Sequence, residues 1–264
     1  MSGNSAFELV SERGWRRGLG SMLRSEFARW WKTRMWWIQC LIWLGIIGFI
    51  VGASLFGPPN PPPPIEVAVL YAIFSGLFPA VGVVIIMQGV VVGEKKDGTA
   101  AWVLSKPVTR SSFILSKVIA NSLGMLVTMV LLPALMVYVL ISIATGTPWN
   151  PLGFLAAMGV IFLSNFFFLS LALMLGTLFN SRGPVIGIAL GLLFLQQYLI
   201  GWLPVLKNIL PWNLVIPIGQ QLDALVPCLI IGCNNISYVL VGSVALESLL
   251  FILIGLYRFS REEF

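Results

Sequence analysis

Six long apolar segments, separated by short polar ones, dominate the chain. A helix needs about 20 mostly apolar residues to cross the roughly 30 Å hydrocarbon core of a bilayer, and each segment is about that long or longer. We therefore predict an all-α integral membrane protein that forms one transmembrane domain over residues 1–264. The predicted spans are residues 36–56, 67–92, 113–145, 152–179, 185–203 and 238–257.

Residues 19–34 precede the first span and show a different pattern. Apolar side chains recur there at helical spacing and share one face, whereas the basic side chains, Arg29 among them, fall elsewhere. Such a basic amphipathic helix is typical of the membrane interface, and Trp30 and Trp31 suit the polar boundary of a bilayer. Glu26 projects towards the apolar arc. We interpret it either as a carboxylate that snorkels or pairs with an arginine, or as a contact to a partner protein.

Residues 93–112, between the second and third predicted spans, form the most highly charged internal segment. Gly98 ends its polar first part, and Thr99 is suited to cap a short helix that runs through Leu104. Pro107 ends that helix, because the residue before a proline is pushed out of the helical region. The helix is apolar for a loop. It is therefore either an interfacial helix that seals the bundle or a docking surface for a partner.

Residues 204–237, between the fifth and sixth predicted spans, are interrupted by prolines and asparagines. We predict short extracytoplasmic helices that lie at the membrane interface or dip into it, where irregular backbone must be covered by other protein. Cys228 and Cys233 fall in this segment. Oxidising surroundings would permit a disulfide between them, and two free cysteines in an apolar stretch are the equal alternative.

Composition and charge fix the compartment and the orientation. The chain has 264 residues, of which 58% are hydrophobic and 10% charged, whereas soluble domains contain about 25% charged residues. Its basic residues cluster beside the apolar segments, so the positive-inside rule explains the net charge of +6 better than nucleic-acid binding does. If both termini are cytoplasmic, every basic residue except Lys207 lies inside. We therefore predict a multi-pass protein of the inner (cytoplasmic) membrane with both termini in the cytoplasm.

The sequence offers little for catalysis. It contains no histidine, which removes histidine-based acid–base chemistry and most zinc sites. It also lacks the G-x-x-x-x-G-K-[ST] loop that cradles nucleotide phosphates. We therefore expect no catalytic residue, no metal site and no cofactor bound by this chain itself.

A few polar residues fall inside the predicted spans. Glu247 lies near the middle of the sixth span, where a carboxyl group is costly and is a functional candidate by default. Gln88, Asn165, Gln196 and Gln197 are milder candidates for an internal path. Each of these side chains could equally serve an interhelical hydrogen bond, so a role in translocation and a role in packing both stay open.

The segment from Glu94 to Arg110, followed by Phe113 to Lys117, resembles the first cytoplasmic loop of the type-2 ABC transporter permeases. That family shows an acidic residue, a Gly-Thr pair, an apolar stretch, a Pro-Val-Ser/Thr-Arg run and a lysine that opens the next span. Residues 25–29 also resemble the amphipathic helix that precedes the first span in these permeases. Six spans and an irregular segment before the last span agree with the family, so the resemblance covers nearly the whole chain.

The resemblance implies the membrane subunit of an exporter, in which two permease chains, identical or related, pair above two separate ATPase subunits. The ATPase subunits bind ATP and Mg²⁺, and the permease chain alone does not hydrolyse ATP. The short helix between the second and third spans would be a coupling helix seated on the ATPase, with a second, smaller contact in the turn 180–184. The residues implied in coupling are Glu94, Asp97, Gly98, Thr99, Trp102, Leu104, Pro107, Arg110 and Arg182.

Two other functions fit the same pattern of spans. A self-contained ion- or proton-coupled secondary transporter would use Glu247, although the sequence shows no inverted repeat or pair of broken helices in corresponding halves to support it. A membrane scaffold or assembly subunit would transport nothing, and it would tolerate bulky residues at Gln88 or Gln196.

Overall fold

The structure is a computed structural model that describes residues 14–60, 62–219, 223–233 and 237–262. The regular elements of these residues are helices, and six of them are long and apolar enough to cross a membrane. The prediction of an all-α integral membrane protein is therefore confirmed. Residues 1–13, and the pieces 220–222 and 234–236 of the predicted extracytoplasmic segment, lie outside the described residues.

The spans follow the hydropathy pattern, with local shifts set by prolines and caps. Pro64 lies in the first turn of the second span, where its missing N–H costs no hydrogen bond. This span ends at Met87, earlier than predicted, because residues 88–91 turn before a separate short helix begins. The spanning helices are α2 (Met35–Phe56), α3 (Pro64–Met87), α6 to α7 (Arg110–Thr145), α8 (Pro151–Leu178), α9 (Arg182–Trp202) and α12 (Val239–Ser260).

The third span changes its helical winding just before Pro133. It runs as α6 (Arg110–Met125), a π-helical stretch (Leu126–Leu131) and α7 (Leu132–Thr145). Pro133 lies in the first turn of α7. A proline inside a helix lacks the N–H donor and its ring crowds the preceding turn, which accounts for the wider winding just before it.

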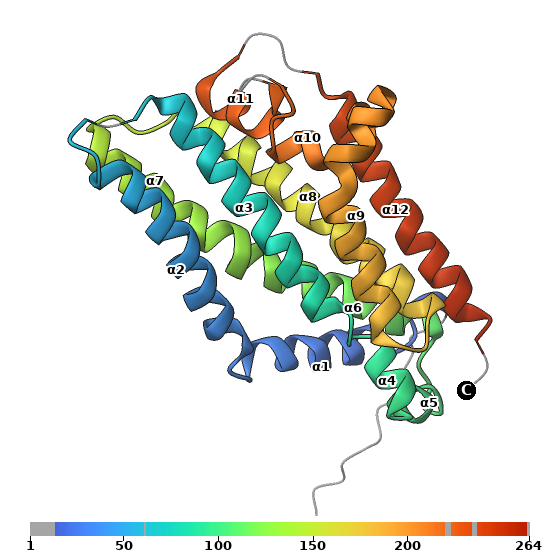
Figure 1. The fold of residues 1–264 in the computed structure, drawn as a ribbon. Coiled ribbons are helices and arrows are strands. Elements are labelled where there is room, and N and C mark those ends of the chain that lie inside the picture. Colours follow the sequence, from blue (N-terminus) through green and yellow to red (C-terminus); the bar gives the residue numbers. More distant parts are fainter. Residues whose placement is uncertain (1–13, 61, 220–222, 234–236, 263–264) are drawn as a thin grey trace, which may run out of the picture.

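Helix α8 is the centre of the bundle (Figure 1). It packs against α3, α9, α12 and the short helix α11 (Leu225–Ile231). Within the most apolar 18 residues of each span, 72% of the α8 residues are buried, against 28% for α2 and α9 and 22% for α12. The exposed side chains of those three outer helices are largely apolar, as expected for helices that face lipid or another protein in the membrane.

One end of the bundle is closed by short helices between α9 and α12. Helix α10 (Trp212–Val215) and α11 pack on α3 and α8 there, and a disulfide joins Cys228 to Cys233. The side-chain oxygen of Gln196, near the end of α9, accepts a hydrogen bond from the backbone N–H of Trp212 at 3.0 Å. We call this the α11 end.

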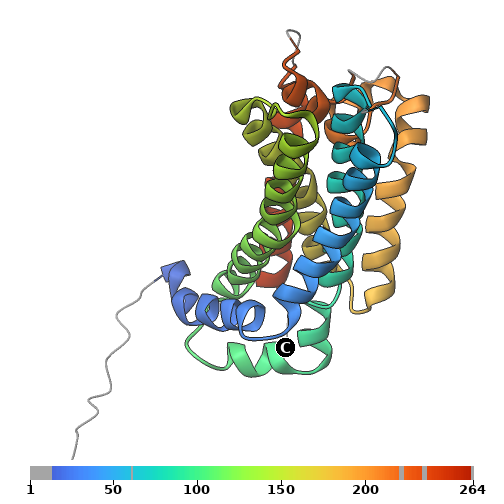
Figure 2. The same ribbon diagram turned by 90° about the vertical axis from the view of Figure 1, so that its left-hand side faces the viewer.

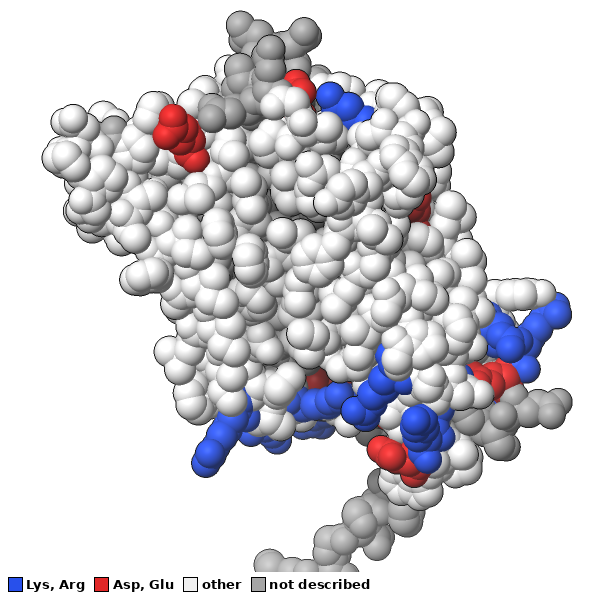
Figure 3. Space-filling view, in the orientation of Figure 1, with Lys and Arg blue, Asp and Glu red and all other residues white. Residues whose placement is uncertain are grey.

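The other end carries the three short elements around the predicted loop. Helices α1 (Leu19–Trp31) and α5 (Thr99–Leu104) both lie across the bundle, crosswise to the spans, and α4 (Val92–Lys96) lies beside α5 (Figures 1 and 2). Most of the Lys and Arg side chains that Figure 3 shows gather at this end. We call it the basic end, and it contains the candidate functional site.

Candidate functional site

The loop between α3 and α6 folds into two short helices, α4 and α5, which are separated by a turn at Gly98. Gly98 has φ +67°, in the left-handed region that favours glycine, and it occupies the N-cap position of α5. Thr99 is therefore the first residue of α5 rather than its cap, which corrects the predicted capping. Thr109 does cap α6, since its hydroxyl accepts a hydrogen bond from the N–H of Ser112 at 3.2 Å.

Helix α5 has an anchored face and an exposed face. Ala100 is fully buried, and Val103 and Leu104 pack partly buried against the main core. Trp102 is 62% exposed, and the ammonium group of Lys106 lies 3.4 Å from its ring centroid. Thr99, Asp97 and Pro107 are also exposed. The helix thus holds a large aromatic side chain outside the bundle while its other face is fixed.

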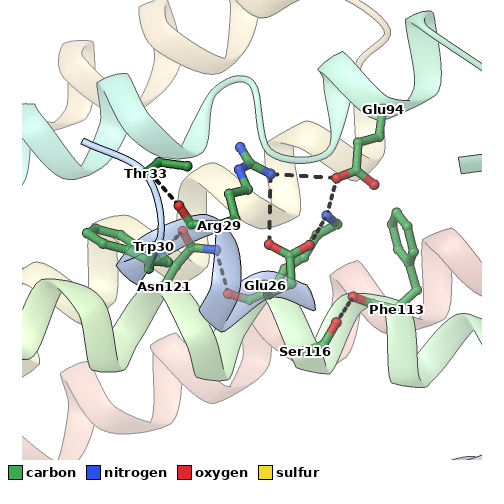
Figure 4. Close-up of polar contacts among 9 residues, drawn as sticks. Glu26, Arg29, Trp30, Thr33, Glu94, Phe113, Ser116 and Asn121 are labelled. Atoms are coloured by element: carbon green, nitrogen blue, oxygen red, sulfur yellow. Dashed lines mark hydrogen bonds and ion pairs between the residues drawn. The ribbon is translucent and has the colours of Figure 1, made fainter. Parts of the chain in front are cut away.

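Lys117 of α6 lies between two carboxylates from different elements, those of Glu26 and Glu94, which are labelled in Figure 4. Its ammonium nitrogen is 2.7 Å from Oε1 of Glu26 on α1 and 2.5 Å from Oε1 of Glu94 on α4. The lysine side chain has no exposed surface, and the Glu26 and Glu94 side chains are 7% and 21% exposed. Burying a charge is costly unless it is paired and hydrogen-bonded, and here the lysine has two anionic partners.

Arg29 completes this group of charges, which we call the ionic centre (Glu26, Arg29, Glu94 and Lys117). Its guanidinium is 3.8 Å from Glu26 and 3.7 Å from Glu94, and its side chain is half exposed. The four groups together balance two positive charges with two negative ones. Glu26 is thus a paired carboxylate, and Glu94 points inwards to α1 and α6 rather than away from the protein (Figure 4).

A second contact fixes α1 on α6 beside the ionic centre. The indole N–H of Trp30 donates to the side-chain oxygen of Asn121 at 3.0 Å, and the Asn121 amide donates to the carbonyl oxygen of Lys117 at 2.7 Å. Gly124 lets the indole approach, because a Cβ at that position would lie 2.5 Å from the ring. Trp31, by contrast, is exposed and tilts against Trp36 at the start of α2.

The other side of α4 is tied to the end of α12. The Lys95 ammonium is 2.5 Å from a carboxylate oxygen of Glu262 and 3.3 Å from the carbonyl oxygen of Thr177 at the end of α8. Arg110, the first residue of α6, donates to the carbonyl oxygen of Ser260 at 2.6 Å. Two consecutive residues of α4 therefore contact different helices. Glu94 contacts α1 and α6, whereas Lys95 contacts the end of α8 and the segment after α12.

Two aromatic rings add to this second link. Phe113 of α6 and Phe259 of α12 are both fully buried and stack with ring centroids 5.1 Å apart. Arg182, at the start of α9, lies against α4 and the turn before it, since a Cβ on Gly93 would be 3.4 Å and one on Gly89 3.7 Å from its guanidinium. The basic end thus brings the two predicted contact regions, the loop 93–112 and the turn 180–184, side by side.

The predicted polar residues inside the spans lie in different surroundings. Asn165 lines a cavity of about 10 Å³ and donates weakly to the carbonyl oxygen of Ser75 at 3.5 Å, whereas Gln196 lines a separate cavity of the same size. Such a volume suits about one water molecule. Gln197 is exposed on α9 and Gln88 is half-buried at the end of α3. Their positions support packing and capping roles as much as a path.

Glu247 lies apart from these residues on α12. It is half-buried, and one of its carboxylate oxygens, Oε2, is shielded from solvent without a hydrogen-bond partner among the described residues. In the same described part of the chain, we find no group of three or more His, Cys, Asp and Glu side chains suited to hold a metal ion.

The pairing that forms the ionic centre was not predicted from the sequence. Lys117 was expected only to open the third span, and Glu26 to snorkel, to pair with an arginine or to contact a partner protein. A signal was present: each residue puts a charge into an otherwise apolar pattern, and the two charges have opposite signs. The link from Lys95 to Glu262 had no comparable signal, because both side chains belong to polar segments.

The fold and the basic end together define a multi-pass permease-type membrane protein. The chain belongs to the ABC-2 transporter family, since the family model described as "ABC-2 family transporter protein" matches residues 20–264. The predicted resemblance to type-2 ABC permeases is therefore confirmed, and the chain is the membrane subunit of an ABC transporter rather than its ATPase. A search of curated proteins found no match to the chain.

Proposed function

We propose that this chain exports a substrate across the cytoplasmic membrane and is driven by separate ATPase subunits that dock on the loop 93–112. The basic end faces the cytoplasm, as the distribution of Lys and Arg supports. ATP and Mg²⁺ bind to the ATPase subunits. The observation that carries the proposal is Trp102, which is 62% exposed on a helix whose opposite face is buried.

An exposed tryptophan on an anchored helix suits a docking surface. Trp is among the residues that most often dominate binding energy at interfaces, where it fills a pocket of the partner. Helix α5 is packed on the core through Ala100, so a displacement of Trp102 by a bound partner would move the bundle as well as the loop. In this arrangement α5 is the coupling helix, and Asp97, Thr99 and Pro107 border Trp102 on the exposed surface.

Arg182 supplies the second, smaller contact. It is exposed at the start of α9 and lies against the turn that leads into α4. A partner that covers α5 can therefore reach Arg182 without crossing another helix. A second permease copy pairs with the first within the membrane, and the exposed apolar faces of α2, α9 and α12 are the surfaces available for it and for lipid.

Binding of the ATPase tests the proposal. Trp102→Ala should weaken co-purification of the ATPase subunit about 30-fold in affinity, since a tryptophan hot spot contributes about 2 kcal/mol or more. The matched control is Trp202→Ala, which makes the same change at an 85% exposed tryptophan at the α11 end. Equal ATPase binding by wild type and Trp102→Ala would contradict docking on α5.

Glu247 supports a second candidate function, a self-contained ion- or proton-coupled transporter. A carboxylate oxygen buried inside a span without a partner is costly and is typical of ion or proton pathways. Flux measured in vesicles that contain only this chain separates the two functions. Flux that Glu247→Gln abolishes would favour the second candidate, and flux that requires the ATPase would favour the first.

A further inference from the structure

We infer that Lys117 is a positioning residue that makes α1, α4 and α6 move as one unit. The force on this unit comes from α5, so the role in transport rests on the proposed function. The unit itself rests on contacts within the chain and can be tested without a partner. Its consequence is that the membrane-surface helix α1 is carried along with the docking loop rather than serving only as an anchor.

The ionic centre joins three elements through one ammonium group. Lys117 belongs to α6, Glu26 to α1 and Glu94 to α4, and the two carboxylates lie 2.7 and 2.5 Å from the lysine nitrogen. An ammonium group has three donors, so it can serve both carboxylates at once. Because the lysine side chain has no exposed surface, water cannot replace a partner that moves away.

Separation of α1, α4 or α6 would therefore break at least one charged hydrogen bond of the buried Lys117 ammonium group. Removing one partner from a buried ion pair is strongly unfavourable, whereas displacing the whole group together breaks no contact. Arg29 reinforces this preference, since it bridges Glu26 and Glu94 from the half-exposed side at 3.8 and 3.7 Å. The motion of lowest energy keeps the three elements together.

A single ion pair could still act as a pivot, but α1 has a second fixed point on α6. The Trp30 indole is hydrogen-bonded to Asn121 and packs against Gly124, one to two turns further along α6 than Lys117. Two points of attachment fix the direction of α1 as well as its position. Since only Asp97 and Gly98 separate α4 from α5, a displacement of α5 reaches the unit directly.

Hydrogen exchange on the purified chain in lipid nanodiscs tests the unit. Glu26→Gln, a change in α1, should speed amide exchange in the peptide that contains α4, and Glu94→Gln should speed exchange in α1. We expect about tenfold or more, as follows from weakening one charged hydrogen bond that protects against local opening. The matched control is Glu66→Gln at the exposed start of α3, which should change neither peptide.

Two further variants separate the charge from packing and from misfolding. Lys117→Met should release α1 and α4 together while peptides of α9 and α11 keep their exchange rates. The combination of Glu26→Gln, Glu94→Gln and Lys117→Met removes the charges without leaving any of the three unpaired, and it should still release both helices. Exchange that rises only in the substituted helix, or wild-type protection in the combined variant, would overturn the inference.

The complex with the ATPase gives an independent second arm. Trapping the complex with ATP and vanadate should alter exchange in α1 and α4 together in wild type. In Glu26→Gln, α4 should still respond fully while the response of α1 falls, because α1 then keeps its Trp30 and Arg29 contacts but not the ion pair with Lys117, a split that a merely structural role would not produce. An α1 response equal to that of wild type would overturn the inference and leave the proposed function standing. If no ATPase binds the wild-type chain, the proposed function fails. Hydrogen exchange on the purified chain then still tests whether α1, α4 and α6 form one unit.

Discussion

The two ends of the bundle are held together by different kinds of contact. At the basic end, elements far apart in the sequence meet through buried charges, as Glu26 and Lys117 do, and through side-chain bonds to helix ends, as Arg110 and Ser260 do. At the α11 end, a disulfide links two cysteines five positions apart, and short helices pack on α3 and α8 through largely apolar side chains.

The α11 end also has an ion pair, but of another kind. Lys207 and Asp223 lie 3.6 Å apart with side chains 39% and 37% exposed. Exposed pairs contribute about 0–1 kcal/mol because water and salt screen them. The comparison indicates that the basic end joins distant helices through buried charges, whereas the α11 end joins them through apolar packing and a short disulfide loop. A force applied at α5 would therefore spread first through the helices of the basic end.

The largest effect should come from removing the central lysine. Lys117→Met leaves Glu26 and Glu94 close together without their shared cation, and breaking a buried pair in this way costs about 3–5 kcal/mol. The same substitution at Lys207, in an exposed pair, should cost at most about 1 kcal/mol. Unfolding of both variants in detergent, followed by circular dichroism, measures the difference.

This pair of variants also tests the comparison itself. Similar losses of stability at positions 117 and 207 would mean that the buried pairing at the basic end has no special role. A smaller loss in Glu26→Gln than in Lys117→Met is also expected, because the lysine then keeps Glu94 as its partner.

The next largest loss of stability should come from a substitution that blocks the close approach of α1 to α6. Gly124→Ala places a Cβ 2.5 Å from the Trp30 ring, and overpacking of this kind costs about 1–3 kcal/mol. Gly45→Ala on α2 is the control, since a Cβ there meets nothing within 4 Å and alanine favours a helix. Thermal unfolding and Trp30 fluorescence should change in the first variant alone. An unchanged indole signal in Gly124→Ala would show that Trp30 does not need this close approach.

Much of the fold could be predicted from the sequence because a bilayer imposes a length and a polarity on each span. Apolar runs located the six helices, and Gly98 and Pro107 delimited α5. The exact ends depended on local chemistry, such as Thr109 capping α6 before the apolar run begins. The positions of the spans and helix ends depend on residues close together in the sequence, so they can be predicted from the sequence.

The ionic centre could not be predicted in the same way, because it depends on how α1 lies across α6. Glu26 and Lys117 are 91 positions apart, and their pairing follows from the packing of Trp30 on Gly124. The sequence marked Glu26 as unusual, whereas Lys117 stood out only as the lysine that opens the third span. For the same reason Glu94 was placed among the residues of the docking surface, although the fold turns its side chain inwards. Its contribution to ATPase docking remains a prediction that the Glu94→Gln variant can test alongside Trp102→Ala.

The most local effect should follow reduction of the disulfide at the α11 end. Opening the bond between Cys228 and Cys233 should cost about 2 kcal/mol, the chain-entropy value for so short a loop. Exchange should then rise in α11, which packs on α8 and α3, while α1 and α4 keep their protection because no contact of the ionic centre depends on that loop. Cys228→Ser with Cys233→Ser should reproduce the effect of reductant, and Cys40→Ser, at a buried free cysteine, is the control for the thiol chemistry. If reduction also increased exchange in α1 and α4, the two ends would be coupled through α8. The contrast between a cooperative basic end and an independent α11 end would then not hold.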